Sequence, residues 1–131
     1  MEIKKADEKI EKEIHEKLKK FNEKFAKYSG DLSLYIEEDG ENIGGVVGTA
    51  IGETLDIDFL CIDEKYRGRG YAKKLMLALE EEAKKHNLKR IVLDTYEFQA
   101  PKFYEKLGYK LYCKLENAWG EYTKYFYIKE I

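Results

Sequence analysis

The chain has 131 residues and a net charge of −2, from 24 Lys and Arg against 26 Asp and Glu. This length suits a single domain over residues 1–131 with a hydrophobic core, and 44% hydrophobic and 14% aromatic residues argue against disorder. The nearly balanced charge excludes a global attraction to nucleic acid or to a membrane surface, and no apolar run approaches the roughly 20 residues that span a bilayer.

The two cysteines, Cys61 and Cys113, stand alone in the sequence, with no metal-ligand spacing around either of them. We therefore expect no metal site, and two reduced cysteines that serve as small core residues and do not pair with each other. The N-terminus lacks the apolar segment of a signal peptide, which together with the reduced cysteines predicts a cytoplasmic protein.

An amphipathic helix is predicted near the start of the chain, from Asp7 onward. Its apolar residues recur at steps of three and four, and Lys and Glu fill the remaining face. These apolar residues are Ile10, Ile14, Leu18, Phe21, Phe25 and Tyr28. Residues 29–31, Ser-Gly-Asp, should end the helix, whereas residues 1–5 are ambiguous and could form a very short strand.

Three strands of an antiparallel meander are predicted next, over residues 32–36, 43–51 and 55–62. Three glycines weaken the second of them. Strict alternation along the third strand places two sets of side chains on opposite faces. One set is Leu55, Ile57, Phe59 and Cys61, and the other is Asp56, Asp58, Leu60 and Ile62.

The second half of the chain predicts a crossover helix over about 70–86 and a strand over 90–94. This strand should pair parallel and be buried on both faces, because it is short, apolar and follows a crossover helix. A short helix over 98–107 and an antiparallel pair, 109–115 and 122–128, complete the chain. The predicted fold is a mixed α/β domain with a mostly antiparallel sheet, one βαβ crossover and helices on both faces.

The segment 67–70, Arg-Gly-Arg-Gly, runs directly into the crossover helix and is a candidate binding site. A helix N-terminus leaves about four backbone N–H groups unbonded and carries roughly half a positive charge. The glycines and the small Ala72 would let an anion approach these groups, and the arginines and Lys73 would attract it. A phosphate or diphosphate suits this arrangement. From the loop alone, a flexible turn kept soluble by its arginines explains it equally well.

Two familiar phosphate-binding motifs do not fit this loop. A P-loop needs a longer glycine loop that ends in Gly-Lys-Ser/Thr, which Lys73-Lys74 does not provide. The dinucleotide-binding fingerprint needs its loop after the first strand and a third small residue where Lys73 stands.

Two segments resemble signature motifs of the GNAT superfamily of N-acetyltransferases. Residues 67–72, RGRGYA, are similar to the Arg/Gln-x-x-Gly-x-Gly/Ala loop that cradles the diphosphate of acetyl-coenzyme A (acetyl-CoA) in that family. Residues 98–109, FQAPKFYEKLGY, resemble the family's helix that ends in Phe-Tyr-Glu-Lys-x-Gly-Phe/Tyr. With the element order, the resemblance covers roughly residues 32–128. The residues expected around acetyl-CoA are Arg67, Gly68, Arg69, Gly70, Tyr71, Ala72 and Lys73.

The resemblance implies an enzyme that moves an acetyl group from acetyl-CoA to a primary amine by direct attack on the thioester. The pantetheine arm is expected where strands 55–62 and 90–94 splay apart, paired with the backbone of Leu60 and Ile62. One of those N–H groups could stabilise the oxyanion. Many members carry Asn where this chain has Glu97, and an ionised carboxylate cannot donate the same hydrogen bond, so that role is not transferred.

Tyr104 matches the position at which many members of this family hold a general acid beside the coenzyme sulfur. A phenol suits that role because its pKa of about 10 lies near that of an alkyl thiol. An ordinary core tyrosine is the alternative. Asp56 and Asp58 could accept the amine proton or bind a cationic acceptor, and the sequence does not choose between them.

The acceptor amine, a small molecule or a peptide, is not identified by the sequence. Trp119, Tyr122 and Tyr125 could wall its pocket, cover the last hairpin or form a dimer contact, so a homodimer stays open. Two other functions are also open. One is a non-catalytic regulatory module that binds coenzyme A. The other is nucleic-acid binding through the Arg/Gly loop and the lysine-rich first helix, which the balanced charge disfavours.

Overall fold

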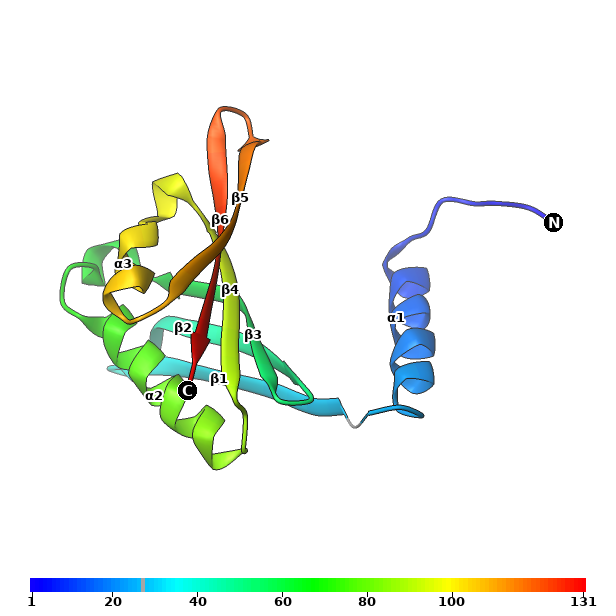
Figure 1. Ribbon diagram of the computed structural model, residues 1–131, viewed down its shortest axis with the longest axis horizontal. Helices are drawn as coiled ribbons and strands as arrows, with labels where there is room; N and C mark the ends of the chain where they lie inside the picture. Colours follow the sequence, from blue (N-terminus) through cyan, green and yellow to red (C-terminus); the bar gives the residue numbers. More distant parts are fainter. Residues whose placement is uncertain (27) are drawn as a thin grey trace.

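The computed structural model describes residues 1–26 and 28–131, including every side chain in these ranges except those of residues 28 and 29. The elements follow one another in the predicted order (Figure 1). They are α1 (Glu8–Asn22), β1 (Tyr28–Glu38), β2 (Glu41–Ile51), β3 (Thr54–Ile62), α2 (Tyr71–Lys85), β4 (Arg90–Tyr96), α3 (Pro101–Lys106), β5 (Lys110–Trp119) and β6 (Tyr122–Glu130). Two 3-10 turns, η1 (Glu64–Tyr66) and η2 (Glu97–Gln99), precede α2 and α3.

The six strands form one sheet in the order β1-β2-β3-β4-β6-β5. Only β3 and β4 pair parallel, through the crossover helix α2, and the other neighbouring strands pair antiparallel. This arrangement confirms the mixed α/β fold with a mostly antiparallel sheet.

Helices α2 and α3 cover one face of this sheet, whereas α1 stands apart on the other side (Figure 1). The core lies between the sheet and these two helices. It includes Val46, Leu55, Ile57, Leu75, Met76, Leu79, Ile91, Leu93, Tyr104 and Tyr127. The opposite surface, which carries Tyr35, Val47, Phe59, Asp94 and Tyr96, is called the open face, and its large side chains are exposed or only partly buried.

A buried ion pair fastens α2 to the last strand. Glu80 of α2 is buried, and its Oε1 accepts hydrogen bonds from Lys129 Nζ at 2.9 Å and from the Tyr109 hydroxyl at 3.3 Å. The same ammonium donates to the Leu107 carbonyl at 2.6 Å. One cation thus links α2, β6 and the end of α3.

A β-bulge in β3 overturns the predicted alternation of this strand. Val47 pairs with Phe59 but the next residue, Gly48, pairs with Ile57, so Asp58 has no partner on β2. One unpaired residue shifts every later side chain to the other face. Leu60 and Ile62 therefore point to the helix side with Leu55 and Ile57, whereas Phe59 and Cys61 turn to the open face. The prediction that grouped Phe59 and Cys61 with Leu55 and Ile57 was wrong.

Two glycines of β2 are explained by close contact with neighbouring strands. A Cβ at Gly44 would lie 2.7 Å from the Cys61 carbonyl oxygen, and one at Gly48 would lie 2.8 Å from that of Leu32. Both distances are shorter than real Cβ contacts, so a larger residue would push the strands apart.

Three element boundaries differ from the prediction. Helix α1 ends at Asn22, and Tyr28 begins β1 instead of ending the helix. The helix predicted over 98–107 is interrupted at Ala100, whose φ is 68°, because the residue before Pro101 is disfavoured in the α conformation. Strands β5 and β6 run as far as Trp119 and Tyr122, so a two-residue turn replaces the predicted 116–120 loop.

Several residues are less buried than the sequence predicted. Cys61 and Cys113 are exposed free thiols rather than core residues. In β4, Ile91 and Leu93 are buried, but Val92 is only partly covered because α2 and α3 lie on one face alone. No residue of α1 is buried. Among the described residues, no helix is long and apolar enough to span a bilayer.

Candidate active site

The central parallel strands separate at one end, which opens a gap in the sheet. Strands β3 and β4 pair only from Thr54 and Arg90 as far as Ile57 and Leu93. Both strands continue beyond this point, β3 to Ile62 and β4 to Tyr96. The bulge at Asp58 lies where the pairing stops, so the bulge and the splay occur at the same place. An extended chain could therefore lie along the unpaired edge of β3.

The Arg/Gly loop leads from the end of β3 to the N-terminus of α2. Gly68 and Gly70 have positive φ values of 76° and 81°, which glycine adopts without strain. A Cβ at either position would meet nothing within 4 Å. Gly70 is the N-cap of α2 and offers no side chain to bond the first N–H groups. This helix end therefore has room for an anion beside its first N–H groups.

The cations of the loop differ in what they contact. Arg67 Nε donates to the Ile62 carbonyl at 2.9 Å, so this side chain fastens the loop to the end of β3. The Arg69 guanidinium lies 5.3 Å from the ring centroid of Tyr66. Lys73 is exposed, and neither it nor Arg69 forms an ion pair with any carboxylate in the described part of the chain. Arg69 and Lys73 therefore leave the loop positively charged.

Tyr71 and Ala72 form the first turn of α2 and are partly buried. The Tyr71 ring meets that of Tyr66 edge-on, at a centroid distance of 6.4 Å. Tyr66 thus lies between Arg69 and Tyr71, so these aromatic contacts stiffen the loop.

Tyr104 lies in α3 with its ring in the core. Its neighbours are the rings of Phe103, Tyr109 and Tyr127, at centroid distances of 5.1 to 6.1 Å. Burial, with a smaller effect of the Asp94 charge, raises the pKa of Tyr104 to about 12. Its hydroxyl has no hydrogen-bond partner within residues 1–26 and 28–131. A protonated phenol without a partner can donate to a bound molecule.

Three carboxylates gather where the strands diverge. Burial, then the negative charges of Asp58 and Asp94, raise the pKa of Asp56. Thr49 Oγ1 donates to Asp58 Oδ2 at 2.8 Å, and Lys124 Nζ lies 3.5 Å from Asp94 Oδ1. Asp56 and Asp58 are thus close to each other, as predicted, but the bulge separates them from the side chains of Leu60 and Ile62.

Sequence reasoning missed Asp94 as a member of this group. Asp94 ends a run of apolar residues that was predicted to be buried on both faces. Because of this prediction, Asp94 was not expected to be exposed on the open face. The signal that could have found it is the alternation along β4, in which Val92, Asp94 and Tyr96 alternate with the buried residues between them.

Four aromatic side chains form a cluster at the same end of the sheet, and we call it the aromatic cluster. Phe98 stacks on Tyr96 at 5.5 Å and meets Trp119 at 5.7 Å and Tyr122 at 4.9 Å edge-on. Trp119 and Tyr122 therefore lie together, as the pocket-wall hypothesis required. Tyr125 does not join them, since it stacks on Tyr127 of the same strand at 6.4 Å.

Glu97 has a structural contact that explains its departure from the resemblance. Its Oε1 accepts a hydrogen bond from the Thr123 backbone N–H at 2.7 Å. The carboxylate thereby holds η2 against β6. No cofactor contact is needed to account for Glu97.

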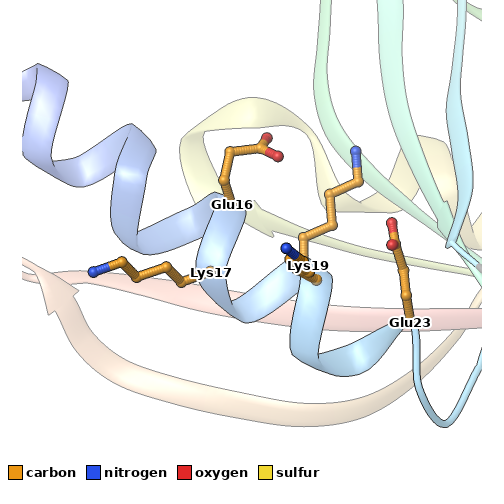
Figure 2. Close-up of a pocket in the computed structure, with 5 residues that line it drawn as sticks. Glu16, Lys17, Lys19 and Glu23 are labelled. Carbon is orange, nitrogen blue, oxygen red and sulfur yellow. The ribbon is translucent and has the colours of Figure 1, made fainter.

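Two other kinds of site, a metal centre and a pocket on α1, lack the residues that acetyl transfer would need. No group of three or more His, Cys, Asp or Glu residues within the described ranges could hold a metal ion. Figure 2 shows a depression with a charged lining, which is formed by α1 and the turn that follows it. Neither the Arg/Gly loop nor Tyr104 contributes to this lining. Its lining residues are Glu16, Lys17, Lys19, Lys20 and Glu23.

Comparisons with known proteins agree on one family. The sequence profile of the Acetyltransferase (GNAT) family matches residues 2–109. Over 95 residues the chain is 32% identical to blasticidin-S acetyltransferase of Streptomyces morookaense, covering 72% of this chain and 70% of that protein. Crystal structures of an acetyltransferase from Bacillus cereus (31% identity, TM-score 0.85) and of a protein from Agrobacterium tumefaciens (27%, TM-score 0.87) cover all of this chain and 98% of theirs.

Proposed function

Since the chain belongs to the GNAT acetyltransferase family, it is an acetyl-CoA-dependent N-acetyltransferase, and we propose that its Arg/Gly loop holds the diphosphate of acetyl-CoA. The observation that carries this proposal is the uncapped N-terminus of α2, where two glycines leave open space and where Arg69 and Lys73 have no carboxylate partner among the described residues. Backbone N–H groups of residues 70–73 would bind the phosphate oxygens. Arg69 and Lys73 would add charge, whereas Arg67 keeps the loop in place through the Ile62 carbonyl.

The pantetheine arm is proposed to lie in the gap between β3 and β4. Beyond Ile57, the edge of β3 that faces β4 has no partner strand, so an extended amide chain could pair with it. The backbone N–H of Leu60 or Ile62 would then lie near the thioester and stabilise the oxyanion that forms on direct attack by the amine.

Tyr104 is proposed to protonate the departing thiolate. Its raised pKa keeps the hydroxyl protonated at neutral pH, and this hydroxyl has no competing partner among the described residues. Protonation of the sulfur as the C–S bond breaks removes the need to expel a free thiolate. Proton transfer from water or another group is the alternative.

The acceptor is proposed to be a small, cationic amine. Asp56, Asp58 and Asp94 give the end of the open face a net negative charge, because Lys124 offsets only one of the three carboxylates. The aromatic cluster beside them presents rings that favour organic cations. One of the carboxylates, Asp56 or Asp58, would take the proton that the ammonium must lose before it attacks. The relative named blasticidin-S acetyltransferase supports a small-molecule acceptor rather than a peptide.

We place this reaction in the cytosol, where exposed thiols such as those of Cys61 and Cys113 stay reduced. The testing experiment is a thiol-release screen in which acetyl-CoA is mixed with the protein and a panel of amines. Small polyamines and amine-bearing antibiotics should release coenzyme A, and their N-acetylated forms, as matched controls, should not. Retention of coenzyme A without release by any amine would favour a non-catalytic regulatory module instead.

A further inference from the structure

A stripe of large apolar side chains on α1 lacks any covering partner among the described residues. Helix α1 and the turn after it stand apart from the sheet (Figure 1), and no residue of the helix is buried. The stripe side chains are between 41% and 78% exposed and recur at steps of three and four. They are Ile10, Ile14, Leu18, Phe21 and Phe25. An apolar stripe of this kind normally faces a core, and a large exposed patch marks an interaction site.

A matching apolar surface lies on the open face of β1 to β3. Tyr35, Val47, Ile51 and Phe59 are between 42% and 70% exposed there. Val47 and Phe59 are direct neighbours in the sheet, because the bulge at Asp58 turns Phe59 to this face. Since α2 and α3 occupy the other face, neither helix can cover these side chains.

The position of α1 is shared with two solved relatives. The Bacillus cereus and Agrobacterium tumefaciens structures align over the whole chain with TM-scores of 0.85 and 0.87. Residues 1–26 are about a fifth of the 131 residues, so the rest of the chain alone cannot reach such scores, and at least part of this segment superimposes as well. The separation of α1 from its own sheet is therefore common to three chains, which argues against α1 closing over its own open face.

We propose that two copies of the chain form a symmetric dimer in which the α1 stripe of each copy packs on the open face of β1 to β3 of the other. A two-fold axis satisfies both surfaces at once, since each copy supplies one stripe and one sheet face. Nine large apolar side chains, each covering on the order of 100 Å², bury on the order of 900 Å² per copy, the size of a standard interface.

The test is sedimentation velocity of the full-length protein at about 100 µM, far above the micromolar dissociation constants of weak interfaces of this size. Leu18→Glu places a charge in the stripe, and Phe59→Glu places one on the sheet face. Leu77→Glu is the matched control, because Leu77 is an exposed leucine on α2, outside both surfaces. Circular dichroism checks that each variant stays folded, which is expected since all three side chains are exposed.

The wild type and Leu77→Glu should sediment as dimers, and Leu18→Glu and Phe59→Glu as folded monomers. A monomeric wild type would overturn the proposal, since it would mean that α1 stays free or closes over its own sheet. A dimer that survives Phe59→Glu but not Leu18→Glu would also overturn it, because stripe would then pack on stripe. If all three variants stay dimeric, or if all three become monomeric, the dimer does not use the two assigned surfaces and the proposal is refuted.

Discussion

The buried ion pair between Glu80 and Lys129 predicts a large and specific loss of stability. In Lys129→Met, Glu80 keeps only the 3.3 Å hydrogen bond from Tyr109, and the Leu107 carbonyl loses its 2.6 Å donor. Removal of one partner of a buried pair typically costs about 3–5 kcal/mol. The Lys129 side chain is 23% exposed, so we expect the low end, about 3 kcal/mol. For a chain of this length that is a fall in Tm of roughly 10 °C.

A double-mutant cycle separates the ion pair from the loss of packing. Replacement of both charges, in Glu80→Leu with Lys129→Met, should cost about 1 kcal/mol, less than Lys129→Met alone, because no buried charge is left unpaired. Lys85→Met is the matched control, since Lys85 pairs with Glu82 at 3.0 Å on the surface and should lose about 0.5 kcal/mol or less. Urea unfolding at pH 7 measures the free energies of unfolding of the wild type, Glu80→Leu, Lys129→Met, the double variant and Lys85→Met. Equal losses for Lys129→Met and Lys85→Met, or additive losses in the double variant, would refute this reasoning.

Two further predictions concern the site. Tyr104→Phe should lower single-turnover acetylation by about 10²–10⁴-fold and leave coenzyme binding unchanged, whereas full activity with a lowered Tm would return Tyr104 to the core. Asp56 has a pKa raised above its ordinary 3.8. Its contribution to stability is therefore present at lower pH and is lost as the pH rises through the folded pKa. Asp56→Asn should raise the Tm at pH 7 but not at pH 3, and an unchanged Tm difference across this range would contradict the assignment.

The sequence predicted those features that depend on local pattern. The period of α2 identified its buried residues Leu75, Met76 and Leu79, and the glycines before it identified the open helix N-terminus. The end of α3 was foreseen from Gly108, which has a φ of 94°. Each of these features is determined by residues within about one helical turn of each other.

The missed features depend on contacts between distant residues. Nothing in the strand residues 54–62 marks Asp58 as a bulge, because the shift arises from pairing with β2. Likewise, the Arg67 contact with the Ile62 carbonyl requires the loop to fold back on β3. The exposure of the α1 stripe could not be predicted either, since its period is that of a helix packed on its own core.

The most direct test of the proposed active site is calorimetric titration of acetyl-CoA into Gly70→Val. A Cβ at Gly70 meets no protein atom within 4 Å, so the valine would occupy the space in which the diphosphate is expected. Gly120→Val is the matched control, because Gly120 also has a positive φ, 59°, and open space around it, but lies in the β5–β6 turn. We predict that Gly70→Val, once shown to be folded, binds at least about tenfold more weakly, whereas Gly120→Val binds as the wild type does. Equal affinities in folded Gly70→Val and the wild type would contradict the placement of the diphosphate at the N-terminus of α2.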